Sequence, residues 1–207
     1  MRYLVLITSA ILLGACATES VTASPIAEPT QAVPAVEPTQ QELQPTAEQP
    51  SPTDGPDFKL LSSAFVQGDP IPAAFSCDGE NISPRLTWTH PPDGLLSFAL
   101  ILDDPDAPVG TWVHWVLFNI PAEARSLPES IGPDPMLANG AVHGSNSWNS
   151  IGYGGPCPPG GEHRYFFKLY ALDSDLELEV GATKEQVLAA MEGHILGQTD
   201  LMGTYSR

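Results

Sequence analysis

The sequence predicts a mostly β fold, an antiparallel β-sandwich with a C-terminal helix and long loops beside its strands. Apolar, β-rich runs recur along the chain after residue 57 and are separated by clusters of Gly, Pro, Asp and Asn. This part of the chain, about 150 residues, is long enough for one well-buried core and short for two domains. Together these observations favour one sandwich domain over residues 57–207.

Five runs of apolar and β-branched residues are the expected strands. Residues 97–102 and 112–120 are nearly continuous in apolar character, which predicts central strands that are covered on both faces. The other three runs span residues 58–66, 86–90 and 165–172. The spacing of the five runs is typical of a β-sandwich.

The C-terminal helix is expected to begin after Thr183 and to end near Gly193. Thr183 and Gln186 have the spacing of a capping box, in which each side chain accepts a hydrogen bond from the backbone of the other residue. Apolar residues follow at helical spacing, namely Val187, Leu188, Ala190 and Met191. Between the strands, residues 127–152 are rich in Gly, Pro, Ser and Asn, and we expect a loop of this length to border a functional pocket.

The first residues have the pattern of a bacterial export signal. One positive charge at Arg2 precedes an apolar stretch, residues 4–13, that is shorter than the roughly 20 residues of a membrane-spanning helix. The stretch ends in Leu-Gly-Ala-Cys, which resembles a lipobox. We therefore expect residues 1–15 to be a signal peptide and Cys16 to be lipidated, which would anchor the exported chain to a bacterial membrane at the cell surface or the periplasmic face. The alternative is an ordinary signal peptide with an incidental Cys16.

Residues 16–56 are expected to be a disordered tether. Beyond Cys16 this segment is dominated by Pro, Thr, Glu, Gln and Ala and has no Lys, no Arg and no aromatic residue. Such a composition cannot bury enough apolar surface to offset the loss of chain entropy on ordering. The tether would hold the domain at residues 57–207 away from the lipid surface.

The charge of the chain excludes one class of partner. The formal net charge is −17, and from residue 57 onward there are nineteen Asp and Glu against seven Lys and Arg. A domain of this charge repels polyanions, and it lacks the basic stripe of a nucleic-acid-binding surface. We expect no nucleic-acid partner, and any anionic ligand must be held by local contacts.

Three short segments together have the chemistry of one small polar site. Residues 104–108 form an Asp-Pro-Asp-Ala-Pro turn, residues 112–115 hold a histidine with two tryptophans, and residues 155–165 combine a Gly/Pro loop with a histidine and a tyrosine. Carboxylates suit a cation, imidazoles and a phenol suit phosphate oxygens, and a Gly/Pro loop can direct backbone N–H groups toward an anion. The alternative for residues 104–108 is turn formation alone.

Strand alternation predicts how the polar residues of this site face. It places His114 on the same face as Trp112 and Val116, where a histidine is more often a satisfied core residue than a ligand-binding one. His163 and Tyr165 point the same way, so both can contact one ligand.

Arg164 faces the opposite way from its two neighbours and is expected to form a structural ion pair. The histidines at positions 90, 143 and 194 lack a comparable context. We interpret them as ordinary surface or loop residues.

The order and spacing of these segments resemble the phosphatidylethanolamine-binding protein family, in particular its bacterial branch described as Raf-kinase-inhibitor-like. The resemblance covers residues 58–207. It implies a ligand pocket whose residues are Asp104, Asp106, Pro108, His114, Gly155, His163 and Tyr165, with Asp106 holding the turn as much as touching a ligand. The implied ligand is small and phosphorylated or zwitterionic, like phosphoethanolamine. Its ammonium would pair with Asp104 and its phosphate would contact the histidines and Tyr165, with pH dependence where histidines titrate.

Two cysteines remain if Cys16 is lipidated. Cys77 and Cys157 both flank turn-forming segments, and the bacterial branch of the family often has cysteines at these places. In an exported domain a disulfide between them can persist; the alternative is two buried thiols. Two cysteines without close spacing predict no structural zinc site.

No catalytic residue, metal site or cofactor is expected. The sequence has no GxSxG nucleophile, no HExxH metal spacing, no P-loop and no dinucleotide-binding fingerprint. The resemblance implies a binding or regulatory protein. One alternative function is inhibition of a kinase or an extracellular protease, with residues 139–161 contacting the partner protein. Another is weak phosphoester hydrolysis by Asp104 and His114.

Overall fold

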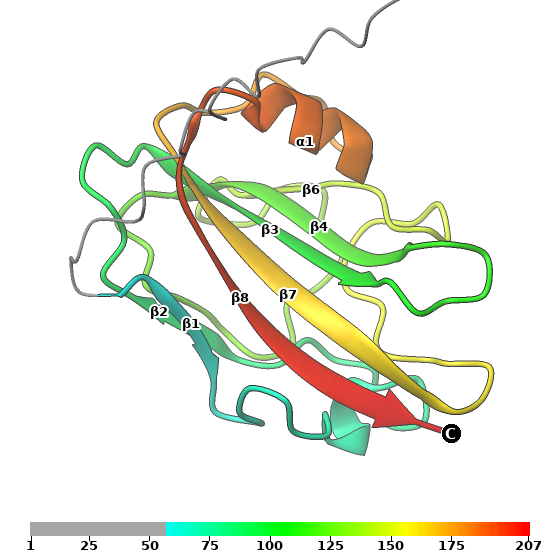
Figure 1. Cartoon of the computed structure of the whole chain (residues 1–207). Helices are drawn as coiled ribbons and strands as arrows, with labels where there is room; N and C mark the ends of the chain where they lie inside the picture. Colours follow the sequence, from blue (N-terminus) through cyan, green and yellow to red (C-terminus); the bar gives the residue numbers. More distant parts are fainter. Residues whose placement is uncertain (1–56) are drawn as a thin grey trace, which may run out of the picture. The chain divides into compact units, whose positions relative to one another are not determined.

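The computed structural model of the protein describes residues 57–207 (Figure 1). The expected signal peptide, the lipidated Cys16 and the tether lie outside the described residues. Within residues 57–207, no helix has both the length and the apolar character that crossing a membrane requires.

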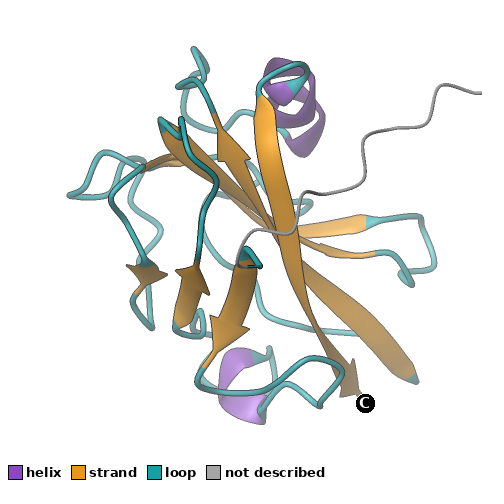
Figure 2. Cartoon of the chain, turned by 60° about the vertical axis from the view of Figure 1, so that its left-hand side comes forward, coloured by secondary structure: helices purple, strands orange, loops and turns teal. Residues whose placement is uncertain are grey.

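Two antiparallel sheets form the fold (Figure 2). The smaller sheet has the order β1-β2-β5, with β1 at Lys59–Ser62, β2 at Leu86–Thr89 and β5 at Ser126–Leu127. The larger sheet has the order β6-β4-β3-β7-β8. Its strands are β6 (Val142–His143), β4 (Trp112–Pro121), β3 (Ser97–Asp104), β7 (Glu162–Leu172) and β8 (Ile195–Ser206). The predicted mostly β sandwich is confirmed.

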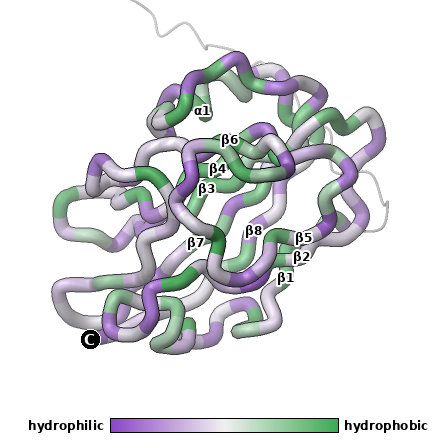
Figure 3. The backbone as a smooth tube through the Cα atoms, turned by 180° about the vertical axis from the view of Figure 1, so that it is seen from behind, coloured by the Kyte–Doolittle hydropathy of each residue, from purple (hydrophilic) through white to green (hydrophobic). Residues whose placement is uncertain are grey.

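Apolar side chains fill both sides of the larger sheet. The main core lies between the two sheets and includes Leu60 and Trp88 from the smaller sheet and Phe98, Trp115 and Phe167 from the larger one. A second apolar cluster lies on the other face of the larger sheet, beneath helix α1 (Lys184–Met191). In Figure 3, hydrophobic segments of β3 and β4 lie in the middle of the molecule. Because the larger sheet is covered on both faces, its strand ends are rigid supports for a site.

The structure confirms several of the predicted elements. All eight residues of β3 are buried, and β3 and β4 are interior strands of the larger sheet, as their continuous apolar character predicts. The capping box also forms: Gln186 N donates to Thr183 Oγ1 at 3.4 Å, and Thr183 N donates to Gln186 Oε1 at 2.8 Å. The helix ends at Met191, two residues before Gly193, whose φ is +83°.

The first and last strands differ from the prediction. β1 covers only four residues of the expected 58–66 run. β8 was not predicted, because its twelve residues include glycines and polar residues without a clean apolar alternation. One of these glycines, Gly203, is required by packing: a Cβ there would lie 2.6 Å from Ile71 Cγ1. β8 forms because β7 provides a partner along its whole length.

A β-bulge in β4 changes the expected side-chain pattern. Leu102 of β3 pairs with Trp115 and Asp103 pairs with Val113, so His114 is an extra residue between two pairs. Val113 belongs to the cluster beneath α1, whereas Trp115 belongs to the main core. The predicted face of His114, shared with Val116, is therefore wrong. The bulge turns His114 to the main-core side, where its ring meets that of Tyr165.

Candidate functional site

A pocket of about 200 Å³ opens where β3 ends and β4 and β7 begin. Its lining comes from the loop between β3 and β4, from the loop before β7, and from Trp148 in the long 127–152 segment. The lining residues are Asp104, Ala107, Pro108, Val109, Trp112, His114, Trp148, Cys157, Pro159 and His163. The long segment therefore borders the pocket, although it also contains β6.

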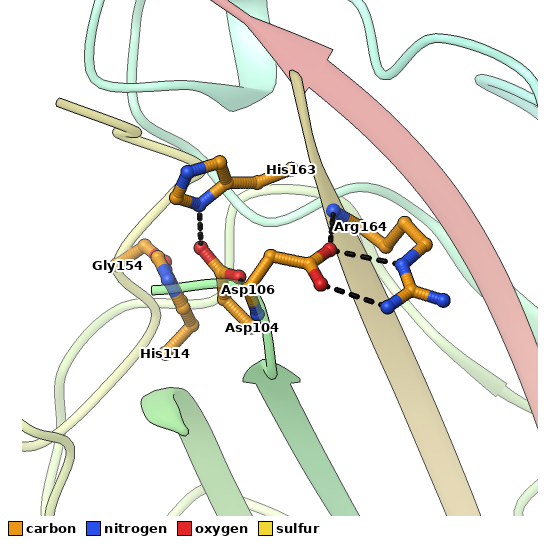
Figure 4. A network of polar contacts seen from close by, with 6 residues as sticks. All are labelled: Asp104, Asp106, His114, Gly154, His163 and Arg164. Atoms are coloured by element: carbon orange, nitrogen blue, oxygen red, sulfur yellow. Dashed lines mark hydrogen bonds and ion pairs between the residues drawn. The ribbon is translucent and has the colours of Figure 1, made fainter. Parts of the chain in front are cut away.

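Asp104 and His163 form a buried hydrogen-bonded pair at the pocket (Figure 4). His163 Nδ1 donates to Asp104 Oδ2 at 2.7 Å, and only 3% of Asp104 and 7% of His163 are exposed. The backbone N–H of Asp106 donates to the other carboxylate oxygen of Asp104 at 2.8 Å. A carboxylate accepts up to about four hydrogen bonds, so Asp104 retains the capacity to bind a ligand cation.

His114 lies against the pocket as a neutral ring. Its Nδ1 donates to the carbonyl oxygen of Gly154 at 2.8 Å, which leaves Nε2 without a proton in the neutral form. Burial lowers the pKa of His114 below its usual value, although the Gly154 hydrogen bond and the negative charge of Asp104 oppose this shift. Contrary to the expectation that both histidines charge near neutral pH, His114 supplies no positive charge to a ligand at pH 7.

Tyr165 lies behind the pocket rather than in its lining. The residue is fully buried, and its ring meets His114 edge to face with centroids 5.2 Å apart. Its hydroxyl is buried and has no hydrogen-bond partner among the described residues. Burial raises the pKa of this phenol, and the negative charge of Asp104 raises it further, so the hydroxyl stays protonated and can act as a donor.

Two tryptophans form an aromatic wall. Trp148 meets Trp112 edge to face at 5.4 Å and meets the ring of His114 at 5.1 Å. Trp148 is 45% exposed, so part of it is accessible from solvent. An aromatic wall beside a carboxylate suits an organic cation, because the π face attracts positive charge.

Asp106 is absent from the pocket lining. Its two oxygens accept from Arg164 Nε at 2.9 Å and from an Arg164 terminal nitrogen at 2.7 Å, as Figure 4 shows. The hydrogen bond from Arg164 lowers the pKa of Asp106 to about 2. The structural ion pair predicted for Arg164 is confirmed, and Asp106 holds the turn.

Gly155 also has a structural position instead of a ligand-binding one. Its N–H donates to Asn81 Oδ1 at 2.8 Å and is not directed at an anion in the pocket. A Cβ at Gly155 would lie 2.4 Å from the carbonyl oxygen of Phe75. The glycine therefore permits close packing of two loops, and the expected anion-binding backbone group is not formed by this residue. Pro108, by contrast, does line the pocket.

A disulfide joins Cys77 to Cys157 next to the pocket. Cys157 is itself a lining residue, and Cys77 N donates to the carbonyl oxygen of Pro156 at 3.1 Å. The bridge connects segments 80 residues apart in the chain, and it fixes one wall of the pocket.

Two polar residues of structural importance were missed or misread in the sequence. Asp103 is fully buried on the α1 side of the sheet, where it binds Lys168 at 2.8 Å and also Lys184. His143 is fully buried in β6, which corrects its interpretation as a surface or loop residue. Its Nδ1 donates to the carbonyl oxygen of Asp134 at 2.6 Å, and burial lowers its pKa. Only tertiary contacts reveal these partners.

The arrangement can bind a small polar ligand and can orient one imidazole. The described part of the chain has no group of three His, Cys, Asp or Glu side chains positioned to hold a metal ion. Among the lining residues Asp104 is the one acidic side chain, and neither Lys nor Arg takes part. The pocket therefore favours a ligand that carries a positive charge.

Comparison with known proteins places this arrangement in a family. Residues 61–206 match the family model described as phosphatidylethanolamine-binding protein. A UPF0098 protein of Methanothermobacter thermautotrophicus is 53% identical over 150 residues, which cover 72% of this chain and 99% of the relative. A UPF0098 protein of Aquifex aeolicus is 44% identical over 156 residues, which cover 74% of this chain and 91% of the relative.

Two solved structures share the fold. The phosphatidylethanolamine-binding protein homolog CT736 of Chlamydia trachomatis has a TM-score of 0.67 and 43% identity, and the match covers 72% of this chain and 97% of CT736. YbcL of E. coli, described as a new member of the mammalian family, has a TM-score of 0.68 and 33% identity. That match covers 72% of this chain and 98% of YbcL.

Proposed function

We propose that this chain, which belongs to the phosphatidylethanolamine-binding protein family, binds small zwitterionic phosphorylated ligands such as phosphoethanolamine. The observation that supports the proposal is a buried carboxylate–imidazole pair, Asp104 with His163, at a pocket walled by Trp112 and Trp148. An ammonium group fits between the Asp104 carboxylate and the aromatic faces. Among the lining residues, His163 can donate to a phosphate oxygen through Nε2 when its imidazole is charged, because its Nδ1 already donates to Asp104.

Charge favours a zwitterion over a plain anion. Inorganic phosphate would meet the Asp104 carboxylate in a domain with an excess of acidic residues, and His114 is neutral at pH 7. A ligand that brings its own ammonium neutralises Asp104 and removes this repulsion. The predicted order of affinity is phosphoethanolamine first, ethanolamine second and inorganic phosphate last.

Calorimetric titration of the protein with these three compounds tests the proposal. Asp104→Asn and His163→Gln are expected to weaken phosphoethanolamine binding at least about tenfold, because each removes a charge-assisted contact. His194→Gln is the matched control, since His194 forms a similar pair with Asp173 at 2.8 Å but on the surface. Equal binding of phosphate and phosphoethanolamine, unchanged in Asp104→Asn, would overturn the proposal.

One observation favours a second function, weak phosphoester hydrolysis. His163 Nδ1 donates to the Asp104 carboxylate, and such a bond orients an imidazole to act as a general base through Nε2. The sequence paired Asp104 with His114 for this role, whereas the structure pairs it with His163. Release of phosphate from phosphoethanolamine, lost in His163→Gln and retained in His194→Gln, would support hydrolysis. Stable ligand without turnover would exclude it for this substrate.

We further propose that the domain acts on the outer side of a bacterial membrane, attached through a lipidated Cys16. The support is the signal pattern of residues 1–16. A single acyl chain gives weak attachment, whereas several chains give stable anchoring. Expression of Cys16→Ser is expected to move the protein from the membrane fraction to the soluble fraction. Equal membrane retention of this variant would contradict the proposal.

A further inference from the structure

We propose that Arg207 supplies the positive charge that the pocket lining lacks and binds the phosphate group of the zwitterionic ligand. The inference rests on the proposed binding function and assigns a residue that the sequence motifs do not contain. It follows from the charge of the lining, from the position of every other cationic side chain after residue 57, and from the contacts of Arg207.

A phosphate group in this pocket needs a nearby cation. A phosphate monoester carries about 1.5 to 2 negative charges at pH 7. The lining includes the Asp104 carboxylate and neither Lys nor Arg. The ammonium of the ligand neutralises Asp104, so the phosphate itself is left without a compensating protein charge. In recognition of phosphate, that charge is commonly the guanidinium of an arginine, which can donate two parallel hydrogen bonds.

Most other cations are bound elsewhere. From residue 57 onward the chain has seven Lys and Arg. Lys168 and Lys184 bind Asp103 on the α1 side of the sheet. Arg164 is held by both oxygens of Asp106, which is not part of the pocket lining.

Apart from Arg207, three cations remain, and each lies in a strand of the smaller sheet or directly before one. Lys59 lies in β1 and pairs with Asp57 at 3.1 Å. Arg85 directly precedes β2, and Arg125, directly before β5, donates to the carbonyl oxygens of two neighbouring residues. Among the Lys and Arg side chains of residues 57–207, Arg207 is therefore the one with a hydrogen bond to a residue of the pocket lining, Cys157.

Arg207 is anchored beside that wall. Its backbone N–H and C=O both pair with Gly161, at 3.3 and 3.2 Å. One terminal nitrogen of its guanidinium lies 3.6 Å from Cys157 Sγ, and Cys157 lines the pocket. Figure 1 shows the C-terminal end of β8 beside the loop that leads into β7, which is the loop that supplies this wall.

The guanidinium of Arg207 has partners, but several of its N–H donors are still available for hydrogen bonds. Its other terminal nitrogen binds Asp78 Oδ1 at 2.6 Å in a pair with 44% and 33% exposed side chains. A guanidinium has five N–H donors, and these contacts use few of them. Exposed ion pairs are weak, so a doubly charged phosphate at the pocket competes effectively with Asp78 for Arg207.

Opposite changes to the Arg207–Asp78 pair separate this role from a structural one. Arg207→Gln removes the cation, whereas Asp78→Asn keeps the cation and removes its competitor. If Arg207 binds phosphate, the first variant weakens binding of phosphoethanolamine and the second leaves it equal or tighter. If the pair only braces the pocket wall, both variants weaken binding. Arg85→Gln is the control for loss of an arginine far from the pocket.

The experiment is calorimetric titration of the four proteins with phosphoethanolamine and with ethanolamine. Arg207→Gln is expected to weaken phosphoethanolamine binding about three- to tenfold and to change ethanolamine binding by less than about twofold. Equal phosphoethanolamine affinity in the wild type and Arg207→Gln, or parallel losses in Arg207→Gln and Asp78→Asn, overturns the role of Arg207 while the binding function stands. Absence of binding of both compounds to the wild type overturns the binding function itself.

Discussion

Asp103 and Asp104 are consecutive residues at the end of β3, and both are buried, yet they have opposite surroundings. Asp103 faces helix α1 and binds two lysines, Lys168 and Lys184. Asp104 faces the pocket and binds one histidine, His163. The pleat of the strand thus sends two identical side chains to two different environments.

The difference shows how one strand end can serve stability on one side and binding on the other. A buried carboxylate is unfavourable unless cations and hydrogen bonds compensate it. On the α1 side two lysines provide the compensating charge, Lys168 and Lys184. On the pocket side the partner is an imidazole and a pocket lies beside it, which is where we propose that the ligand cation binds. We interpret Asp103 as a structural residue and Asp104 as the ligand-binding one.

The largest expected effect on stability is that of Asp103→Asn. Removing the carboxylate leaves two partly buried lysines without their partner, and breaking a buried pair costs about 3 kcal/mol of the free energy of unfolding. Urea denaturation measures this loss. Calorimetric titration with phosphoethanolamine should give an affinity within about twofold of the wild type, because the pocket side is untouched. Lost binding with unchanged stability would reverse the assignment of the two acids.

Lowering the pH should decrease the free energy of unfolding, because the pocket side of the fold buries a neutral histidine, His114. Burial places the pKa of His114 in the folded state below that in the unfolded state, which is about 6.5. As the pH falls below about 6.5, the unfolded chain binds a proton that the folded chain does not. The free energy of unfolding then decreases by up to about 1.4 kcal/mol per pH unit for this residue.

Denaturation at several pH values from 7.5 to 5.5, roughly the range over which a histidine titrates, checks this effect. His114→Gln should show a smaller decrease than the wild type, while His143, whose pKa is lowered in the same direction, still contributes in both proteins. The same pH slope in the variant and the wild type would show that His114 is not held neutral by burial.

The helix cap offers a change confined to the α1 side. Thr183→Ala removes the capping box that begins α1, the helix whose first residue is Lys184. The expected loss is about 1 kcal/mol of the free energy of unfolding. Thermal denaturation and titration with phosphoethanolamine together test it, since the affinity should not change. A clear loss of affinity would mean that α1 and the pocket are coupled.

The smallest effect is expected at the surface pair of Asp106 and Arg164. The hydrogen bond from Arg164 lowers the pKa of Asp106 to about 2, so the stabilisation is present above the unfolded pKa, which is about 3.9. It is lost as the pH falls toward 2. Arg164→Gln should therefore change the acid unfolding curve below about pH 4 more than the stability at pH 7. A large loss of stability at neutral pH would contradict the surface role of the pair.

Much of the fold follows from local patterns, but edge elements do not. The continuous apolar runs predict β3 and β4, and the capping box predicts α1. Both signals depend only on residues that are close together in the chain. β8 has a mixed pattern and forms because β7 pairs with it from Ile195 to Ser206. β5 and β6 are too short, at two residues each, to leave a periodic pattern.

Some features of the site also follow from local sequence, whereas others depend on tertiary contacts. The motifs bring together Asp104, His114 and His163 as predicted, because they lie at the ends of adjacent strands. The face of His114 depends on a bulge that alternation cannot show. The lysine partners of Asp103 lie 65 and 81 residues away in the chain. Such partners are fixed by tertiary packing and not by local sequence.

The most direct test of the account is a ³¹P NMR titration of phosphoethanolamine with three proteins: the wild type, Asp104→Asn and Asp103→Asn. The account predicts a saturable change of the phosphorus resonance with the wild type and with Asp103→Asn, at a temperature where both are folded, and none with Asp104→Asn at the same concentrations. The same titration curve with Asp104→Asn as with the wild type would contradict the assignment of Asp104 as the ligand-binding acid.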